Sequence, residues 1–284
     1  MMNQNPKHIA IVCPGGPITQ ELADKTASIA AARFGDSVKL HFHEQCFSLA
    51  GHFAGTDEER SAAFLEVAND PKVDAVWFAR GGYGACRLDP ALFAKLNDHA
   101  RAKTYLGYSD NGTLLARLYK EGIGRPVHGP IPTDLTREGG EDAIARALSF
   151  LVTGDASTLE PSLEVGKKYA AFNITILAHL CGTDWMPDLS GHIIMLEDVG
   201  EYLYRIDRAM FSIMGDKGIQ NAAGIMLGRV SDITENDRPF GQSEEEIVKD
   251  WCKRAGVPYL GRADIGHDAG NKVVPFGLAS PLSA

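Results

Sequence analysis

Along the first half of the chain, short apolar runs alternate with longer stretches in which apolar residues recur every three or four positions. The short runs are typical of strands buried on both faces, and the longer stretches are typical of amphipathic helices. The predicted strands are residues 8–14, 37–43, 73–80, 105–108 and 126–128, and the predicted helices are residues 20–35, 56–69, 89–98, 112–122 and 140–152. Because strands that alternate with helices form parallel sheets covered on both faces, we predict a Rossmann- or flavodoxin-like α/β first domain.

The pattern changes after residues 154–165, a polar stretch without periodicity that contains Pro161. This composition is typical of a linker. Beyond it, long loops separate predicted helices at about 201–214 and 243–255 from predicted strands at about 171–178, 192–197, 223–230 and 257–263. We therefore predict three parts, which are an α/β first domain of residues 1–153, the linker 154–165, and a β-rich, mixed C-terminal domain of residues 166–284.

Four predicted strands of the first domain end in turns rich in glycine or proline, at residues 14–17, 80–84, 109–112 and 128–130. Open parallel sheets bind ligands beyond the carboxyl ends of their strands, and glycine there lets backbone amides approach a ligand closely. Neither GxGxxG nor GxxxxGK[ST] occurs at these turns, which argues against a nucleotide site. An oxyanion hole needs only two convergent amides, and Gly81 and Gly82 are suitable candidates.

Ser109 lies between a predicted strand and a predicted helix, and this position suits two roles. As a helix N-cap the serine needs no further partner, since Ser, Asp and Asn all cap helices well. As a nucleophile on a tight strand-to-helix turn it needs small neighbours, and Gly107 is one. Asn111 stands where such a turn usually has glycine, so these residues leave both interpretations open.

A serine nucleophile needs a base and an acid that orients the base. Of the nine histidines, His267 follows a strand in a glycine-flanked loop, as a mobile base would, while His128 ends a strand and could line the cleft. Glu197 ends an apolar strand, where a partly desolvated carboxylate needs a partner. Asp198 and Glu201 are alternative acids, or ordinary acids at a helix N-terminus. Serine, glutamate and histidine in this order are a workable triad.

Composition narrows the class of protein. The chain has 284 residues, 44% of them hydrophobic and 23% charged, which is typical of a soluble globular protein. A net charge of −9 argues against a nucleic-acid partner, and no apolar run approaches the roughly 20 residues that span a membrane. No signal-peptide core is present, so we expect a cytoplasmic protein. The five scattered cysteines contain no CxxC pair, so we expect no disulfides and no metal or other cofactor.

Motifs spread over nearly the whole chain resemble those of the LD-carboxypeptidases, a family of serine peptidases. They are RGGYG at 80–84, GYSD at 107–110, HGP at 128–130, LEDVGEYLYRIDR at 196–208 and GHD at 266–268. The resemblance implies that Ser109 is the nucleophile and that Glu197 and His267 complete its triad. It also implies an oxyanion hole formed by the backbone amides of Asp110 and of the turn containing Gly82.

The same resemblance implies hydrolysis of a murein tetrapeptide, at the amide between the L-centre of a diamino acid and terminal D-alanine. The cleft would lie at the domain boundary, and the protein could be a homodimer, as members of the family often are. Recognition of a free terminal carboxylate calls for an arginine, for which Arg80, Arg205 and Arg208 compete. Two features depart from the family: Ala171-Phe172 replaces the usual glycine pair, and the C-terminus is short, so we expect a trimmed last strand.

Two other functions remain open. One is an amidase that detoxifies aminoacyl-nucleotide antibiotics, which would need an aromatic platform for a base, and Tyr83 and Trp185 are candidates for it. The other is a non-catalytic, two-lobed ligand-binding protein. It would use the same glycine turns, but it gives Glu197 and His267 no role.

Overall fold

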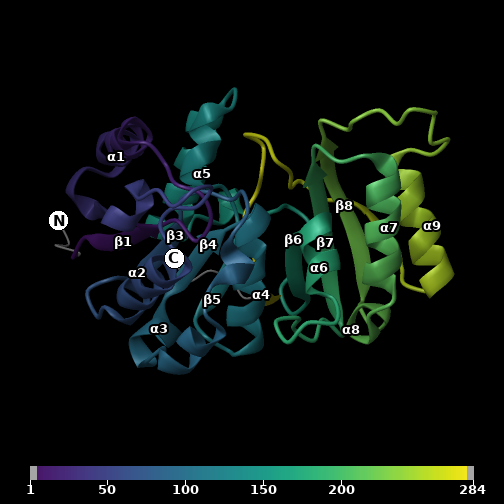
Figure 1. Cartoon of the computed structure of the whole chain (residues 1–284), viewed down its shortest axis with the longest axis horizontal. Helices are drawn as coiled ribbons and strands as arrows, with labels where there is room; N and C mark the ends of the chain where they lie inside the picture. The colour runs from purple at the N-terminus through teal and green to yellow at the C-terminus, as the bar shows by residue number, and fades with distance from the viewer. Residues whose placement is uncertain (1–4, 280–284) are drawn as a thin grey trace.

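The structure is a computed structural model that describes residues 5–279. Two sheets lie side by side, each with its own helices (Figure 1). The N-terminal half of the chain, coloured purple to teal, forms most of the first sheet and its helices, and the green and yellow half forms most of the second. Both sheets are mostly parallel, which confirms the predicted α/β class.

The first sheet has the strand order β10-β5-β4-β3-β1-β2, in which β10 alone is antiparallel. The parallel strands therefore follow the flavodoxin-like order 2-1-3-4-5. They are β1 (Lys7–Val12), β2 (Val38–Phe42), β3 (Ala75–Phe78), β4 (Thr104–Gly107) and β5 (Arg125–His128). One face is covered by α1 (Gln20–Phe34) and α5 (Gly140–Thr153), and the other by α2 (Asp57–Asn69), α3 (Asp98–Ala102) and α4 (Gly112–Lys120).

The predicted helix over residues 89–98 is wrong. Residues Pro90–Lys95 form a 3₁₀ helix, and α3 begins separately at Asp98. The side chain of Asn97 accepts hydrogen bonds from the amides of His99 and Ala100, at 2.9 and 3.3 Å. Asn97 is thus the N-cap of a new helix, and it interrupts the one that the apolar pattern predicted.

The second sheet has the order β11-β6-β7-β8-β9, in which β11 (Gly277–Leu278) is antiparallel. The parallel strands are β6 (Lys168–Asn173), β7 (His192–Val199), β8 (Gly224–Ser231) and β9 (Tyr259–Arg262). One face packs against α6 (Ile174–Leu180), α7 (Leu203–Met214) and α9 (Glu244–Ala255), while α8 (Lys217–Gln220) follows α7. The predicted strand 171–178 is therefore correct only in its first part, because Asn173 caps α6 through the amide of Ile176, at 3.1 Å.

The end of the described chain belongs to both sheets. Strand β10 (Val274–Pro275) pairs with β5 in the first sheet, and β11 follows directly and pairs with β6 in the second. The yellow segment in Figure 1 accordingly runs from the second sheet back to the first. The trimmed last strand that we expected would involve residues 280–284, which lie outside the described residues.

Alternation along the strands determines which side chains share a face. In β7, Ile194 and Leu196 pack toward the helices, whereas Ile193 and Met195 pack on the opposite face. Glu197 continues the second series, whose face is covered by the C-terminal segment through residues such as Ile265. The sheet thus directs this carboxylate away from the helices and toward the loop that contains His267.

The Asn173 cap gives a testable prediction. Asn173→Ala removes the acceptor for the amide of Ile176 and the donor to Asp198, which lies 2.7 Å away. The free energy of unfolding, measured by urea denaturation, should fall by about 1–2 kcal/mol. Asn221→Ala removes an exposed amide side chain and is the matched control, with an expected change within about 0.5 kcal/mol. Equal changes in the two variants would contradict the role of Asn173.

Candidate active site

An open cavity of about 570 Å³ lies at the carboxyl edge of the first sheet. Its walls come from the segments after β1, β3, β4 and β5, together with His267 from the C-terminal half. Open parallel sheets bind their ligands at this edge, where the strand order reverses between β1 and β3. Polar residues of the lining include Thr19, Glu21, Arg80, Ser109, Asp134 and Arg137.

Ser109 occupies a strained turn. Its φ of 60° lies in the left-handed region, which a non-glycine residue rarely adopts. The turn also needs Gly107, because a Cβ there would lie 2.7 Å from the Phe78 ring and 3.1 Å from Asn111 Cβ. Helix α4 begins only at Gly112, and in the part of the chain that is described Ser109 makes no side-chain cap for it. The simple N-cap interpretation therefore does not describe this turn.

The turn after β3 faces the Ser109 hydroxyl. A Cβ on Gly81 would lie 2.9 Å from Ser109 Oγ and 3.7 Å from the backbone nitrogen of Asp110. Glycine is required here because any side chain would occupy the space beside the hydroxyl. Gly82 follows with a φ of 85° and also lines the cavity. Of the turn predicted to contribute to an oxyanion hole, Gly81 is therefore the residue that lies against Ser109, while Gly82 lines the same cavity.

His267 and Glu197 contact each other directly. Nδ1 of His267 lies 2.5 Å from Oε2 of Glu197, and both side chains are buried. Burial lowers the pKa of His267, but the charge and hydrogen bond of Glu197 outweigh it, so the pKa is raised overall. A neutral imidazole donates from Nδ1 to this carboxylate and leaves Nε2 as a proton acceptor. This arrangement is what a general base requires.

The rival acids have other partners. Asp198 accepts from the side chain of Asn173 at 2.7 Å and from the amide of Thr175 at 3.0 Å, on the helix side of β7. Burial raises the pKa of Asp198 to about 6. Glu201 forms an exposed ion pair with Arg205 at 3.4 Å. Of the three acids considered from the sequence, Glu197 is therefore the one that the structure places against His267.

Tyr108 connects the Ser109 turn to His267. Its ring lies 4.8 Å from the ring of His267, and its hydroxyl donates to Asp134 Oδ1 at 2.6 Å. Burial raises the pKa of Tyr108 well above its ordinary value, so the hydroxyl keeps its proton. Asp134 also accepts from Nε of Arg137 at 3.3 Å. Sequence reasoning missed Asp134 and Arg137, which come from a loop with no recognisable pattern.

His128 does not line the cavity but supports the loop that contains His267. It is buried, and its Nε2 donates to Asn271 Oδ1 at 3.1 Å. Burial lowers the pKa of His128 to about 4, so its imidazole is neutral at physiological pH. The same Asn271 oxygen accepts the amide of Gly266 at 3.2 Å, and Arg146 of α5 donates to the Asn271 carbonyl at 3.0 Å. The first domain thus holds the loop of the second.

The sequence-based candidates for substrate binding lie in different places. Arg80 lines the cavity and donates to the carbonyl of Pro17 at 2.7 Å. Arg205 and Arg208 line a separate hollow beside α7. Tyr83 is half-exposed and lies against the rings of His52 and Phe53, whereas Trp185 packs on Phe93, with 5.4 Å between ring centroids. Both aromatic residues lie outside the lining of the cavity.

Within residues 5–279, no group of three or more His, Cys, Asp or Glu side chains is arranged to hold a metal ion. Over the same residues, none of the helices combines the length and apolar character needed to cross a membrane.

Comparison with known proteins identifies one family. The LD-carboxypeptidase N-terminal domain matches residues 9–129, and the LD-carboxypeptidase C-terminal domain matches residues 169–282. Murein tetrapeptide carboxypeptidase of Pseudomonas aeruginosa is 27% identical, over 96% of this chain and 92% of that protein. The crystal structure of muramoyltetrapeptide carboxypeptidase from Oxalobacter formigenes is 26% identical, has a TM-score of 0.78, and is covered over 96% of both chains.

A more distant structure shares the fold. The microcin C7 self-immunity protein MccF is 17% identical with a TM-score of 0.77, over 96% of this chain and 92% of that one. The two domain matches together cover most of the chain, in the order in which its two sheets occur. The chain therefore belongs to the LD-carboxypeptidase family and is a peptidase.

Proposed function

We propose that this protein is a serine carboxypeptidase that removes terminal D-alanine from murein tetrapeptide, at the amide that follows the L-centre of the diamino acid. Ser109 is its nucleophile, His267 its base and Glu197 its orienting acid. One observation carries the proposal: the buried Glu197–His267 pair opens onto the same cavity as a serine held in a left-handed turn. The names of two relatives, which refer to murein or muramoyl tetrapeptides, support the substrate.

The mechanism follows from these positions. His267 Nε2 accepts the proton of Ser109 while Oγ attacks the scissile carbonyl, and Glu197 stabilises the imidazolium. The backbone amides of Asp110 and Gly82 stabilise the tetrahedral oxyanion. The intermediate collapses to an acyl-enzyme, and His267 gives its proton to the departing amine of D-alanine. Water then attacks with the same base and releases the shortened peptide.

Charged side chains around the cavity support a small peptide as the substrate. Arg80, Arg137 and Lys25 supply positive charge, and Glu21 and Asp134 supply negative charge. We infer that Arg80 and Arg137 bind the terminal carboxylate, because a guanidinium forms paired, charge-assisted hydrogen bonds with such a group.

Two observations weigh against the alternative functions. Burying a charged carboxylate is costly, and a protein that only binds its ligand gives no reason to bury Glu197 against His267. An amidase for aminoacyl-nucleotides needs an aromatic surface for the base, and Tyr83 and Trp185 lie outside the lining of the cavity. Murein tetrapeptide is therefore the substrate that the site supports best.

The nucleophile is tested with Ser109→Ala. This variant should release no D-alanine from murein tetrapeptide by mass spectrometry, because it lacks the attacking oxygen. Its affinity for the tetrapeptide, measured by calorimetry, should stay within a few-fold of wild type, because the backbone amides remain. Wild-type incubation with an aminoacyl-nucleotide is the comparison, and nucleotide release without D-alanine release would favour the amidase. Normal turnover by Ser109→Ala would refute the proposed nucleophile.

The acid is tested by pH dependence. Wild-type kcat/KM should fall as the pH drops through the raised pKa of His267, because only neutral His267 accepts the serine proton. Glu197→Gln removes what raises this pKa and leaves the burial that lowers it. The acidic limb of the profile should move to lower pH while kcat falls roughly 10⁴-fold.

Glu201→Gln is the control for this experiment. It removes a carboxylate whose ion pair with Arg205 is exposed, so kcat should stay within about twofold of wild type. An unshifted limb in Glu197→Gln, or equal losses in both variants, would show that Glu197 is not the orienting acid.

The carboxylate site is tested with Arg80→Gln and Arg137→Gln. Each should raise KM for the tetrapeptide about tenfold, because each loses a charge-assisted hydrogen bond. A tetrapeptide with an amidated C-terminus should show little difference between these variants and wild type. Arg205→Gln, in α7 and away from this cavity, is the control and should leave KM unchanged. If the amidated peptide is affected as strongly as the free acid, these arginines do not bind the terminal carboxylate.

A further inference from the structure

The turn of residues 80–85, which places Gly81 over Ser109, is held by side chains at three points. Nδ2 of Asn111 donates to the carbonyl of Arg80 at 3.1 Å, and the amide of Ala85 donates to Asp110 Oδ2 at 2.8 Å. Nη1 of Arg60 donates to the carbonyl of Gly84 at 2.8 Å. Both ends of the turn are therefore fixed to other parts of the site.

Two of the three fixed points come from the nucleophile turn itself. Asp110 and Asn111 directly follow Ser109, and both side chains are buried. A short covalent path thus links the Ser109 hydroxyl to the groups that hold the opposing turn. This explains why asparagine stands at position 111, where such turns usually have glycine: its amide side chain reaches the carbonyl of Arg80.

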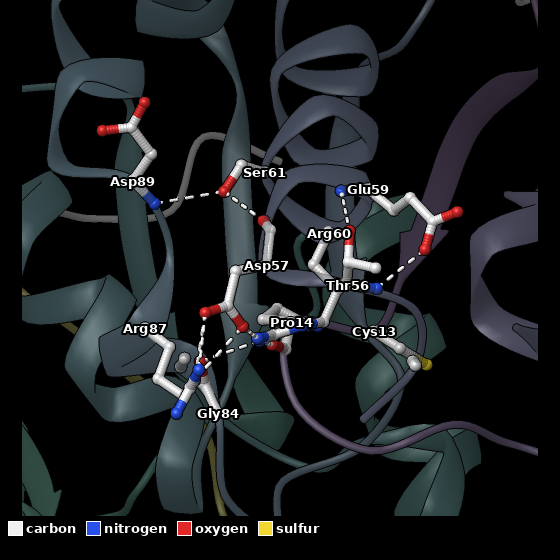
Figure 2. A network of polar contacts seen from close by, with 12 residues as sticks. Cys13, Pro14, Thr56, Asp57, Glu59, Arg60, Ser61, Gly84, Arg87 and Asp89 are labelled. Carbon is white, nitrogen blue, oxygen red and sulfur yellow. Dashed lines mark hydrogen bonds and ion pairs between the residues drawn. The ribbon is translucent and has the colours of Figure 1, made fainter. Parts of the chain in front are cut away.

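Arg60 provides the third point from α2. Its side chain is fully buried, and it also donates to the carbonyl of Pro14 and pairs with Asp57 (Figure 2). Asp57 is bound on its outer side by Arg87, at 2.9 Å. The hydrogen bond from Arg87 and the charges of both arginines keep the pKa of Asp57 low, so it remains a counter-ion for Arg60.

Asp110 faces the turn from inside the protein. Burial raises the pKa of its carboxyl to about 6, although the amides of Ala85 and Gly84 and the charge of Arg60 act in the other direction. The charge of the Asp110 carboxylate is therefore costly at this position, and the contribution of the side chain is the oxygen that accepts the hydrogen bond from the amide of Ala85.

We propose that Asp110, Asn111 and Arg60 are positioning residues that hold the turn of residues 80–85, and with it the amide of Gly82, at the distance from Ser109 that the oxyanion requires. The inference rests on the proposed role of Ser109. Oxyanion donors must be held within about 0.5 Å of their productive position. Loss of one of these three hydrogen bonds, here called tethers, therefore lowers the rate of acylation more than it lowers substrate binding.

Labelling of Ser109 by diisopropyl fluorophosphate tests this without any peptide substrate. Ser109 Oγ forms a bond to phosphorus, fluoride leaves, the serine proton passes to His267, and the phosphoryl oxygen occupies the place of the oxyanion. The rate is followed by intact mass. Asn111→Ala, Asp110→Ala and Arg60→Met should each label about 10- to 100-fold more slowly than wild type. For D-alanine release, kcat should fall similarly while KM stays within about threefold.

Two matched variants separate positioning from general damage. Asp110→Asn keeps an acceptor oxygen for Ala85, so at pH 8 it should label several-fold faster than Asp110→Ala. Arg87→Met removes the other guanidinium from Asp57 but leaves the hydrogen bonds of Asn111, Asp110 and Arg60 to the turn in place, so its labelling rate should be unchanged. Thermal unfolding midpoints are measured for every variant.

Unchanged labelling in the three tether variants would overturn the inference, as would equally slow labelling of Asp110→Asn and Asp110→Ala. A decrease in labelling rate that merely parallels the decrease in unfolding midpoint across the variants would also overturn the inference. These failures are distinct from failure of the proposed function, in which wild-type Ser109 itself takes no label and the inference falls with its nucleophile.

Discussion

Glu197 is a carboxylate without solvent exposure, and its hydrogen-bond partner is the imidazole of His267. Such a carboxylate is stable only when it is paired, so the end of β7 and the His267 loop must stay together. That loop is fastened in turn to the first domain, through His128 and Arg146. The contact between Glu197 and His267, both from the second half of the chain, therefore lies beside a cavity that Ser109 of the first half also lines.

The turns around Ser109 pack closely against one another. Gly15 lies so close to the next turn that a Cβ on it would be 2.9 Å from the Gly81 carbonyl, and Gly81 is as close to Ser109. Arg60 binds carbonyls in the first two of these turns. The left-handed backbone of Ser109 is costly by itself, and it persists because these neighbours leave the chain no alternative path.

The sequence predicted the strands and the fold class because alternation and glycine turns are local signals. It also singled out Glu197, since a carboxylate that ends an apolar strand is unusual without a partner. The errors at 89–98 and 171–178 came from Asn97 and Asn173, whose side chains start new helices within apolar patterns. Asp134 and Arg60 were missed because their partners lie far along the chain, where no local pattern indicates contact.

The C-terminal segment pairs with β5 through β10 and with β6 through β11, only a residue apart. A hinge motion between the two lobes would therefore strain both strand pairings, β10 with β5 and β11 with β6. Wide opening of the molecule therefore requires peeling of one of these two-residue strands, and smaller movements of the cavity walls are the accessible route for admitting a peptide. Residues 274–278, which form these two strands, thus limit how far the lobes can separate.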